Sequence, residues 1–438
     1  MPLYSDTERH ILMLGLNGAG KSTRFLIELL ATASNRSLLV FDLKGELAYQ
    51  TADLRRRYSD VYFINPHRQH GLPSDGFNPA KLDPDDPLFF SQLTDIGAAA
   101  IDFSEKDKHW DESAQSLFEG FLGWEAILAR RERRLPSLAN VRRMLCEPDE
   151  YEVTRDARGR RQEVLVRGVT FTAQRIIAEG GSTADTQTKW VLDPMMAADL
   201  AKPGVDFNAM RTRPTTIYVM IHPMELRKNK RWTRLITSAA LCALMQPGAV
   251  RTLMVLDEFY ASVGNLPILN DVWALVRGYG IQIMPIVQSV LQLQALYKEE
   301  WENYAAQAGL VMSLGPAGDN PTAEWMSKQC GVTTILKASL NESDGFNIGD
   351  GTGSGTTTTG ISSNSNQNSG RNRGAAMNWQ QAESRVLRPQ DIKNIRAGHG
   401  LAWVPGLGTR TIPYFAPNYF RRNAPWVREV RQNPFRGG

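Results

Sequence analysis

The feature that most limits what this chain can fold into is a glycine-rich loop close to its start. The sequence ILMLGLNGAGKSTRF begins at Ile11, and Gly15, Gly20, Lys21 and Ser22 satisfy the pattern G-x-x-x-x-G-K-[ST]. An apolar run precedes the loop and a helix-forming segment, STRFLIELLATA, follows it. This strand–loop–helix context is the one that a phosphate-binding loop (P-loop) requires. We therefore expect an α/β fold in which the loop holds a phosphate group.

The residue types in the loop each have a chemical reason to be there. Glycines let backbone N–H groups curl around a β-phosphate, and Lys21 reaches the β- and γ-oxygens. The Ser22 hydroxyl is predicted to ligate Mg²⁺. A glycine-rich turn without a ligand is the alternative, and the flanking strand and helix argue against it. The predicted nucleotide-binding residues are Gly15, Asn17, Gly18, Gly20, Lys21, Ser22 and Thr23.

Short apolar runs recur along the chain between segments of helix length. Runs rich in Val, Ile and Leu that alternate with helices predict a mostly parallel sheet covered on both faces. A further run, GLAWVPG at 400–406, predicts a last strand. The seven principal runs are 10–14, 37–43, 61–66, 215–221, 252–257, 281–288 and 309–315.

Changes in composition predict how the chain is organised. A long segment between the third and fourth apolar runs has helical periodicity, so we expect an inserted domain. A later segment, dominated by Gly, Ser, Thr and Asn, has too little apolar surface to offset its ordering entropy and is expected to form a flexible loop. The predicted parts are 1–83 and 206–342 for the nucleotide-binding domain, 84–205 for the mostly helical insert, 343–374 for the loop, and 375–438 for the end of the nucleotide-binding domain with a basic tail.

Two patterns stand out inside the predicted insert. Apolar residues at helical spacing predict an amphipathic helix with one apolar face and a basic C-terminal end. The charged stretch VTRDARGRRQEVLVRG, at 153–168, is interrupted by Gly159 and predicts a hairpin rather than a helix. The apolar positions of the helix are Leu117, Phe121, Trp124 and Leu128.

The apolar run TLMVLDEF ends in two carboxylates. Hydrolysis of a bound nucleotide needs a carboxylate for the metal shell and a group that activates water. Asp257 is predicted to bind the Mg²⁺ shell, and Glu258 to orient or deprotonate the attacking water. An Asp-Glu pair after an apolar strand is also an ordinary polar strand end, but beside a P-loop the catalytic interpretation is favoured. The sequence thus predicts a bound nucleotide with Mg²⁺.

Further polar side chains flank the strands predicted next to this pair. Gln288 ends IQIMPIVQ, at the sheet edge where ligands collect, and is predicted to contact the γ-phosphate or the water. Arg277, in ALVRGYG, is predicted to be a finger that reaches a neighbouring subunit's γ-phosphate, with a surface salt bridge as the alternative. Asp42, Lys44 and Glu46 in FDLKGE are expected near the nucleotide if their strand neighbours the P-loop strand, and no chemical step is assigned to them.

Charge and cysteine content narrow the environment and the partners. The formal net charge is +4, and most of the excess lies at the C-terminal end, in a tail that suits nucleic acid, anionic lipid, an acidic partner or simple solvation. The cationic stretch ELRKNKRWTR, at 225–234, is predicted either to contact DNA or to form a solvated helix start. Three scattered cysteines show no metal or disulfide spacing and fit a reducing cytoplasm. The tail's charged residues are Arg421, Arg422, Arg428, Arg431, Arg436 and Glu429.

With these residues assembled, the chain resembles the type IV secretion coupling proteins, the conjugative DNA-transfer ATPases of bacteria. The resemblance covers nearly the whole chain and is carried, in order, by GKST, VFDLKGELAYQTADLRRR, HWDESAQSLFEGFL, RTRPTTIYVMIHPMEL, the block from VLDEF to LQALY, and TAEWMSKQCGVTT. It implies a RecA-like P-loop NTPase with a mostly parallel sheet, an inserted all-α domain and a ring, commonly hexameric, with ATP at subunit interfaces. The site residues it implies are Lys21, Glu258, Gln288 and Arg277 in catalysis and Ser22 and Asp257 at the metal.

The resemblance also implies a function and a location. It implies an ATP-hydrolysing motor that passes relaxase-bound DNA, single- or double-stranded, or effector proteins to a type IV secretion channel. Two alternatives stay open: a soluble DNA translocase or helicase-like ATPase, and a substrate receptor that does not hydrolyse ATP. Members usually carry transmembrane helices before the P-loop strand, whereas ten residues precede it here. We expect a cytoplasmic chain without a transmembrane segment, peripheral at the inner face of the bacterial inner membrane, and either naturally anchorless or beginning after its anchor.

Overall fold

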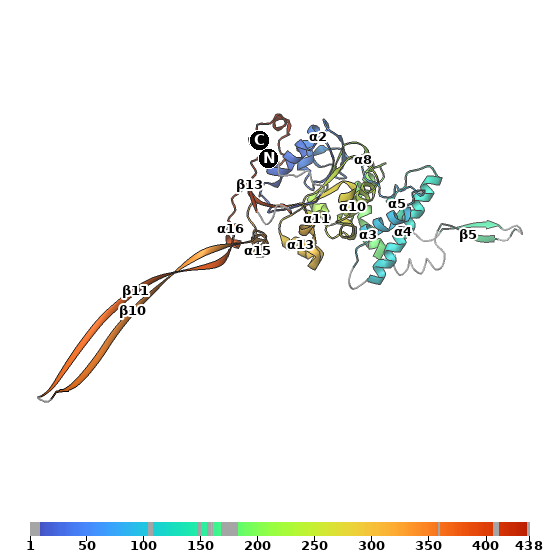
Figure 1. Ribbon diagram of the computed structural model, residues 1–438. Coiled ribbons are helices and arrows are strands. Elements are labelled where there is room, and N and C mark those ends of the chain that lie inside the picture. The colour runs from blue at the N-terminus through green and yellow to red at the C-terminus, as the bar shows by residue number, and fades with distance from the viewer. Residues whose placement is uncertain are drawn as a thin grey trace.

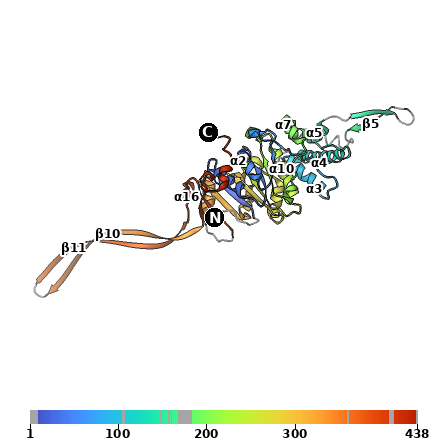
Figure 2. The ribbon, with the colours of Figure 1, turned by 90° about the horizontal axis from the view of Figure 1, so that it is seen from above.

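A large central sheet with helices on both faces forms the body of the molecule, and two hairpins project from opposite ends of it (Figure 1). The view from above in Figure 2 shows the same arrangement. Within the described residues, no helix is both long and apolar enough to cross a membrane. The computed structural model describes residues 9–103, 108–146, 150–155, 159, 161–167, 183–357, 360–405 and 411–435.

Nine strands make up the central sheet, in the order β13-β12-β9-β1-β8-β7-β2-β6-β3. All seven principal runs predicted as strands lie in it, and every pairing among them is parallel. β12 and β13 add an antiparallel edge, so the prediction of a mostly parallel sheet is confirmed. The strands are β1 (Ile11–Gly15), β2 (Ser37–Phe41), β3 (Asp60–Ile64), β6 (Thr215–Val219), β7 (Thr252–Leu256), β8 (Ile281–Val287), β9 (Leu310–Leu314), β12 (His399–Trp403) and β13 (Ile412–Phe415).

The inner strands are apolar along their whole length because helices cover both faces of the sheet. In β1, Leu12 and Leu14 belong to one buried cluster, whereas Ile11 and Met13 belong to the cluster on the other face. The helical segments around the sheet are η1 (Ser22–Leu26), α1 (Ile27–Thr32), α2 (Glu46–Arg55), η2 (Gln69–Gly71), α8 (Ala209–Thr212), α9 (Pro223–Leu226), α10 (Lys230–Leu244), α11 (Phe259–Ser262), α12 (Pro267–Val272), η4 (Val276–Tyr279), α13 (Val290–Tyr297), η5 (Lys298–Glu300), α14 (Trp301–Ala306), α15 (Asn320–Gln329), α16 (Pro389–Lys393), η6 (Tyr419–Arg421) and η7 (Pro425–Glu429).

Between β3 and β6 the described chain is largely helical, as predicted. It also contains the predicted charged hairpin, because β4 pairs antiparallel with β5 and Gly159, between them, has a φ of 73°. The insert is therefore not all-α, and its boundaries at 84 and 205 stay predictions. Its elements are α3 (Phe89–Ala100), α4 (Lys108–Arg131), α5 (Leu138–Cys146), β4 (Glu150–Arg155), β5 (Arg161–Arg167), η3 (Lys189–Leu192) and α7 (Pro194–Leu200).

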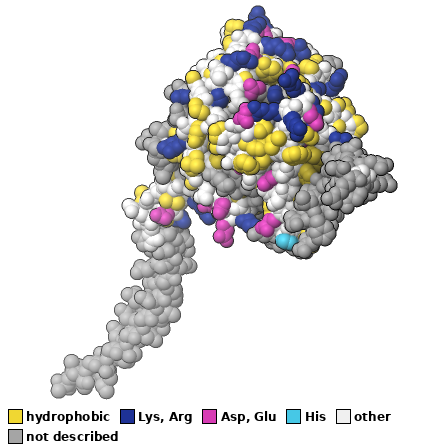
Figure 3. All heavy atoms as spheres, turned by 90° about the vertical axis from the view of Figure 1, so that its right-hand side faces the viewer, with side chains coloured by type: hydrophobic (Ala, Val, Ile, Leu, Met, Phe, Trp, Pro, Cys, Tyr) yellow, Lys and Arg dark blue, Asp and Glu magenta, His cyan; other side chains and the backbone are white. Residues whose placement is uncertain are grey.

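The buried face of α4 matches the one predicted from its apolar spacing only in part. Leu117 is buried and Phe121 packs partly buried against the core, whereas Trp124 is 54% exposed. The buried face is instead continued by Phe118, Leu122 and Ala126. Packing against α3 decides this, because a Cβ at Gly123 would lie 2.9 Å from a Leu93 methyl group, so the glycine permits close approach on that side. Figure 3 faces the insert and shows apolar side chains exposed among Lys and Arg.

The segment predicted as a loop at 343–374 lies within a long two-stranded ribbon. β10 (Val332–Thr357) pairs antiparallel with β11 (Gly360–Arg385), in register from Val332 and Arg385 to Thr357 and Gly360. The composition argument counted only side-chain burial, whereas a ladder of this kind satisfies backbone donors and acceptors without a core. Figure 1 shows the ribbon extending well beyond the sheet.

Candidate nucleotide-binding site

The loop between β1 and η1 has a backbone that requires glycine. Gly18 and Gly20 have φ values of 80° and 89°, in the left-handed region that residues with a Cβ seldom adopt. Ser22 opens a helix directly after the loop, and Lys21 folds back so that its Nζ donates to the Gly15 carbonyl at 3.0 Å. Free amides at such a turn and helix start suit a bound phosphate.

Three of the predicted catalytic side chains meet beside this loop. Lys21 Nζ lies 3.6 Å from Glu258 Oε1. Gln288 Nε2 donates to Glu258 Oε2 at 2.8 Å and to Asn17 Oδ1 at 3.2 Å. These residues follow β1, β7 and β8, so the carboxyl ends of three adjacent parallel strands bring them together. The cluster links the loop to the group predicted to act on water.

Asp257 is a carboxylate held in a desolvated place. Burial raises its pKa to about 6, nearby Lys21 opposes that shift, and the adjacent Glu258 adds to it. Its Oδ1 accepts the Glu258 N–H at 3.0 Å. Glu258 itself has a φ of 48°, a conformation that costs a non-glycine residue on the order of 1–3 kcal/mol and clusters at functional sites. An ordinary polar turn requires neither this left-handed backbone at Glu258 nor a desolvated carboxylate at Asp257, so the strand end has the features of a functional site.

The Ser22 hydroxyl has a partner that the sequence did not reveal. It donates to Glu46 Oε1 at 2.7 Å. The expected condition, that β2 neighbours the P-loop strand, is wrong, because β8 and β7 lie between them. Instead Gly45, with a φ of 68°, turns the chain into α2 so that Glu46 reaches the loop. An acidic residue just after a glycine at a strand end was the available signal.

Asp42, at the end of the same strand, is fully desolvated. The pKa of Asp42 is raised to about 8, chiefly by burial. The Ala48 N–H, which donates to Oδ2 at 2.7 Å, opposes this shift, and the nearby Glu46 and Asp257 contribute to it. Lys44 is exposed. Asp42 therefore orders the turn into α2 and adds a titratable group beside the site.

Arg277 lies at the opposite edge of the sheet. It belongs to η4, before the start of β8, whereas Gln288 follows the end of that strand. Seven residues of strand separate the two edges by roughly 20 Å. The Arg277 side chain is exposed. The pKa of His10, just before β1, is lowered chiefly by the burial of its own ring, and the positive charge of Arg277 lowers it further. Arg277 is thus not in this chain's own site.

The residues present fit magnesium and a nucleoside triphosphate. The half-buried Asp257 carboxylate, the Ser22 hydroxyl and the Glu46 carboxylate that accepts from this hydroxyl offer the oxygen ligands that Mg²⁺ prefers. Lys21 is 8% exposed and supplies a fixed positive charge at the mouth of the glycine loop. Ser22 and Asp257 would hold the ion, and the loop amides with Lys21 would hold the phosphates.

The cationic stretch at 225–234 is not the continuous surface that DNA contact would use. Trp232 is fully buried in α10, so it offers no face to a base. Arg231 and Arg234 both pair with Asp102 of the insert, and Arg234 also donates to the Ala98 carbonyl at 3.1 Å. This part of the stretch instead holds the insert against α10.

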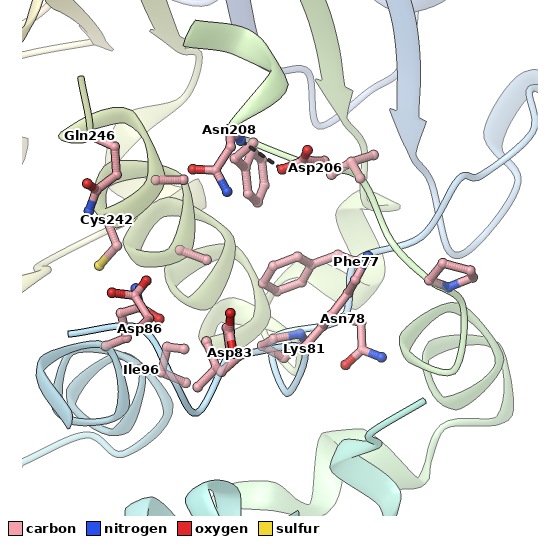
Figure 4. A pocket seen from close by; sticks show the side chains of 18 residues that line it. Phe77, Asn78, Lys81, Asp83, Asp86, Ile96, Asp206, Asn208, Cys242 and Gln246 are labelled. Atoms are coloured by element: carbon pink, nitrogen blue, oxygen red, sulfur yellow. Dashed lines mark hydrogen bonds between the residues drawn. The ribbon is translucent and has the colours of Figure 1, made fainter. Parts of the chain in front are cut away.

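A second concavity lies away from the nucleotide loop. It has a volume of about 360 Å³ and sits where α3, α10 and two loops meet (Figure 4). Asp83, Asp86 and Asp206 lie in its lining together with apolar side chains, and none of the lining residues belongs to the P-loop or follows β7 or β8. Cys242 lines it as well and donates to Asp95 Oδ2 at 3.3 Å.

Comparison with known proteins identifies what the chain is similar to. The family model described as "Type IV secretory system Conjugative DNA transfer" matches residues 3–401. A conjugal transfer protein TraG of Escherichia coli is 23% identical over 369 residues, which are 78% of this chain and 58% of the relative. Protein VirD4 of Agrobacterium fabrum is 23% identical over 358 residues, 78% of this chain and 52% of the relative. The chain thus spans little more than half the length of these relatives.

Solved structures support the fold. The plasmid coupling protein TrwB in complex with the non-hydrolysable GTP analogue GDPNP aligns with a TM-score of 0.64 at 14% identity, over 94% of this chain and 86% of that one. TrwB in complex with ADP and Mg²⁺ aligns with a TM-score of 0.61 at 15% identity, over 94% and 85%. At this identity the likeness shows a shared RecA-like architecture, which confirms the predicted fold class.

Proposed function

Since the chain belongs to the type IV secretory system conjugative DNA-transfer family, we propose that it is an ATP-hydrolysing coupling motor of conjugation. The observation that carries the proposal is the convergence of Lys21, Glu258 and Gln288 at the carboxyl edge of the sheet, beside the half-buried Asp257. A loop that only bound nucleotide would not need a carboxylate fixed by both a lysine and a glutamine. The relatives' names, conjugal transfer protein and coupling protein, support the biological setting.

The residues divide the chemical work among them. Lys21 and the loop amides bind and orient the β- and γ-phosphates, and Ser22 and Asp257 supply the ligands for Mg²⁺. The bound ion would neutralise charge on the phosphate oxygens. Glu258 accepts a proton from, or orients, the attacking water, and Gln288 holds the Glu258 carboxylate through its 2.8 Å hydrogen bond. The second N–H of Gln288 would contact the γ-phosphate in place of Asn17 Oδ1, to which it now donates.

Assembly into a hexameric ring would supply what one chain lacks. Arg277 lies on the opposite edge and is exposed, so it can reach a phosphate only in a neighbouring subunit. Its planar guanidinium would there stabilise charge on the phosphoryl group in the transition state. Leu275 and Tyr279, beside it, are 63% and 45% exposed and offer apolar area to such a neighbour.

The cargo follows from the family. We propose that the motor acts at the inner face of the inner membrane and passes relaxase-bound DNA, single- or double-stranded, or effector proteins to the type IV secretion channel. The relatives named for conjugal transfer support DNA as the first candidate. A soluble translocase and a receptor without hydrolysis remain the competing functions, and the experiment below separates them from the motor.

The test is ATP turnover by the purified chain over a wide range of protein concentration, alone and with single-stranded or duplex DNA. A motor predicts turnover that rises with DNA and with ring formation, and DNA binding that weakens steeply as salt rises. Nucleotide binding without turnover at any concentration would leave the receptor. The soluble translocase also predicts turnover that DNA stimulates, so a second observation separates it from the coupling motor: neighbouring genes that encode a relaxase and secretion-channel components favour the coupling motor, and their absence favours the translocase.

A further inference from the structure

The last described part of the chain is fastened to the nucleotide loop. We call residues 416–435 the C-terminal strap. It follows β13 and contacts η1, α1 and α2, and in Figure 1 and Figure 2 it lies near α2. At its start, the Ala416 carbonyl accepts from Arg24 Nη1 at 2.7 Å. Asn418 Oδ1 accepts from Thr23 Oγ1 at 3.2 Å. The strap therefore contacts the two residues that follow Ser22.

The middle of the strap packs on the sheet's helical cover. Tyr419, Trp426 and Val430 lie against the buried cluster on that face, and the Tyr419 and Trp426 rings stack with their centroids 6.4 Å apart. Arg422 pairs with Glu28 of α1 at 2.7 Å. The sequence predicted that the tail arginines suit nucleic acid or anionic lipid, whereas at least Arg422 forms an ion pair within the chain.

Beyond this point the strap pairs with α2. Gln50 Nε2 donates to the Arg431 carbonyl at 3.1 Å, and the Arg431 N–H donates to the Gln50 carbonyl at 3.2 Å. The Arg431 guanidinium pairs with Asp53, and Glu429 pairs with Arg57 at 2.6 Å. Gln50 is only 2% exposed, so this docking is built into the fold.

The end of the strap reaches the metal side of the site. Asn433 Nδ2 donates to Glu46 Oε2 at 2.9 Å, and Glu46 Oε1 accepts from Ser22 Oγ at 2.7 Å. Since the Ser22 proton points at Glu46, the lone pairs of the hydroxyl are left for a cation. Asn433 holds the other oxygen of the same carboxylate, so the strap fixes the orientation of Glu46 and, through it, that of Ser22.

We propose that the C-terminal strap positions residues of the nucleotide site: Asn433 and Glu46 orient the Ser22 hydroxyl. Docking of the strap thereby raises the affinity of the site for the Mg²⁺-bound nucleotide. The inference rests on the proposed function, because it takes Ser22 as a metal ligand. Coupling of this kind is reciprocal: if docking of the strap raises nucleotide affinity, bound nucleotide must stabilise the docked strap by the same factor.

The direct test is ADP affinity measured by calorimetry, in Mg²⁺ and in EDTA. Asn433→Ala is expected to weaken ADP binding about fivefold in Mg²⁺, which is the net effect of losing one ordinary hydrogen bond, and less than twofold in EDTA. The matched control is Gln432→Ala, which removes an exposed neighbouring amide and should leave both affinities unchanged. Equal affinities for the two variants in Mg²⁺ would overturn the inference.

A double-mutant comparison separates positioning from a general weakening of the fold. In a Glu46→Ala background, Asn433→Ala should have no further effect on ADP affinity in Mg²⁺, because it acts through that carboxylate. Additive losses would contradict this route. If the unmodified protein shows no magnesium-dependent ADP binding, the proposed function itself fails, and this inference fails with it.

Amide hydrogen exchange supplies a readout that does not depend on turnover. Peptides from 416–435 should exchange more slowly in Mg-ADP than in the nucleotide-free protein, and Asn433→Ala should reduce that difference. Exchange of the strap that is the same with and without Mg-ADP would show that nucleotide and strap are not coupled.

Discussion

The two edges of the parallel sheet differ in what they do with their polar groups. At the carboxyl edge, Lys21, Glu258 and Gln288 converge on an open loop. At the amino edge, His10 is buried. Its Nδ1 accepts the Ile283 N–H at 3.1 Å, so its Nε2 is the donor to the Trp273 carbonyl at 2.5 Å. One edge thus keeps its polar groups for a ligand, whereas the other satisfies them internally and leaves Arg277 on the surface.

If Arg277 acts as the proposed finger, this difference means that the site of one chain is incomplete. The carboxyl edge carries the loop, the proposed metal ligands and the group proposed to act on water, whereas Arg277 lies roughly 20 Å away at the other end of β8. Head-to-tail assembly would bring one subunit's amino edge toward the next subunit's carboxyl edge. The predictions below test each edge in turn.

The largest effect is expected at the amino edge. Arg277→Ala should lower the ATP turnover of the assembled protein by about 1,000-fold or more, as arginine fingers do, with nucleotide affinity unchanged. Arg277→Lys keeps the charge without the planar fork and should recover little.

Mixing subunits tests whether Arg277 acts in the neighbour. Rings mixed from Arg277→Ala and Lys21→Ala chains should regain turnover, because the first has an intact loop and the second supplies the arginine. Mixtures as inactive as either parent would show that the two edges do not cooperate across an interface.

At the carboxyl edge, Lys21→Ala should weaken ATP binding by about 100-fold, since a charge-assisted contact to phosphate is lost from a desolvated loop. The control is Lys44→Ala, an exposed lysine on the same edge, for which calorimetry should report unchanged affinity. Similar losses for both variants would mean that general positive charge, rather than the loop geometry, binds the nucleotide.

A smaller effect is expected from the buried carboxyl group of Asp42. Its pKa is raised from 3.8 to about 8, so the folded state keeps the proton that the unfolded state releases, and stability falls as pH rises between those values. Asp42→Asn keeps an acceptor for Ala48 and removes this loss. The free energy of unfolding of Asp42→Asn, relative to that of the unmodified protein, should rise by on the order of 1 kcal/mol for each pH unit between these two pKa values.

Denaturant unfolding at several pH values measures this gain. Asp206→Asn, at an exposed carboxylate, serves as the control and should show a gap that does not change with pH. If the difference in free energy of unfolding between Asp42→Asn and the unmodified protein is also independent of pH, the pKa of the Asp42 carboxyl group is not raised.

Much of the nucleotide edge could be predicted from the sequence because its signals are local. The P-loop motif includes a strand, glycines and a helix start within one short segment. The charged Asp257 directly after the apolar strand β7 marks where that strand ends. Parallel topology then forces such strand ends together. The hydrogen bond between Gln288 and Glu258 follows from that rule, whereas the predicted contact of Gln288 with the γ-phosphate or the water stays a prediction.

The rest depended on packing that no short window encodes. Trp232 sits in a cationic stretch yet is buried, and Trp124 follows an apolar spacing yet is exposed, because neighbouring helices decide which face is covered. The contact between Asn433 and Glu46 joins residues 387 positions apart. The ribbon at β10 and β11 was missed because composition describes side chains, whereas backbone pairing makes the ladder.

The most direct test of a hydrolytic site at the carboxyl edge is the turnover of Glu258→Gln, measured with its ATP affinity in Mg²⁺. The substitution keeps the shape of the side chain and removes its ability to take a proton. A fall of about 100-fold or more in turnover, with affinity within twofold of the unmodified protein, is the result expected of a group that acts on water. Undiminished turnover in Glu258→Gln would contradict that role and, with it, the assignment of this edge as the site of hydrolysis.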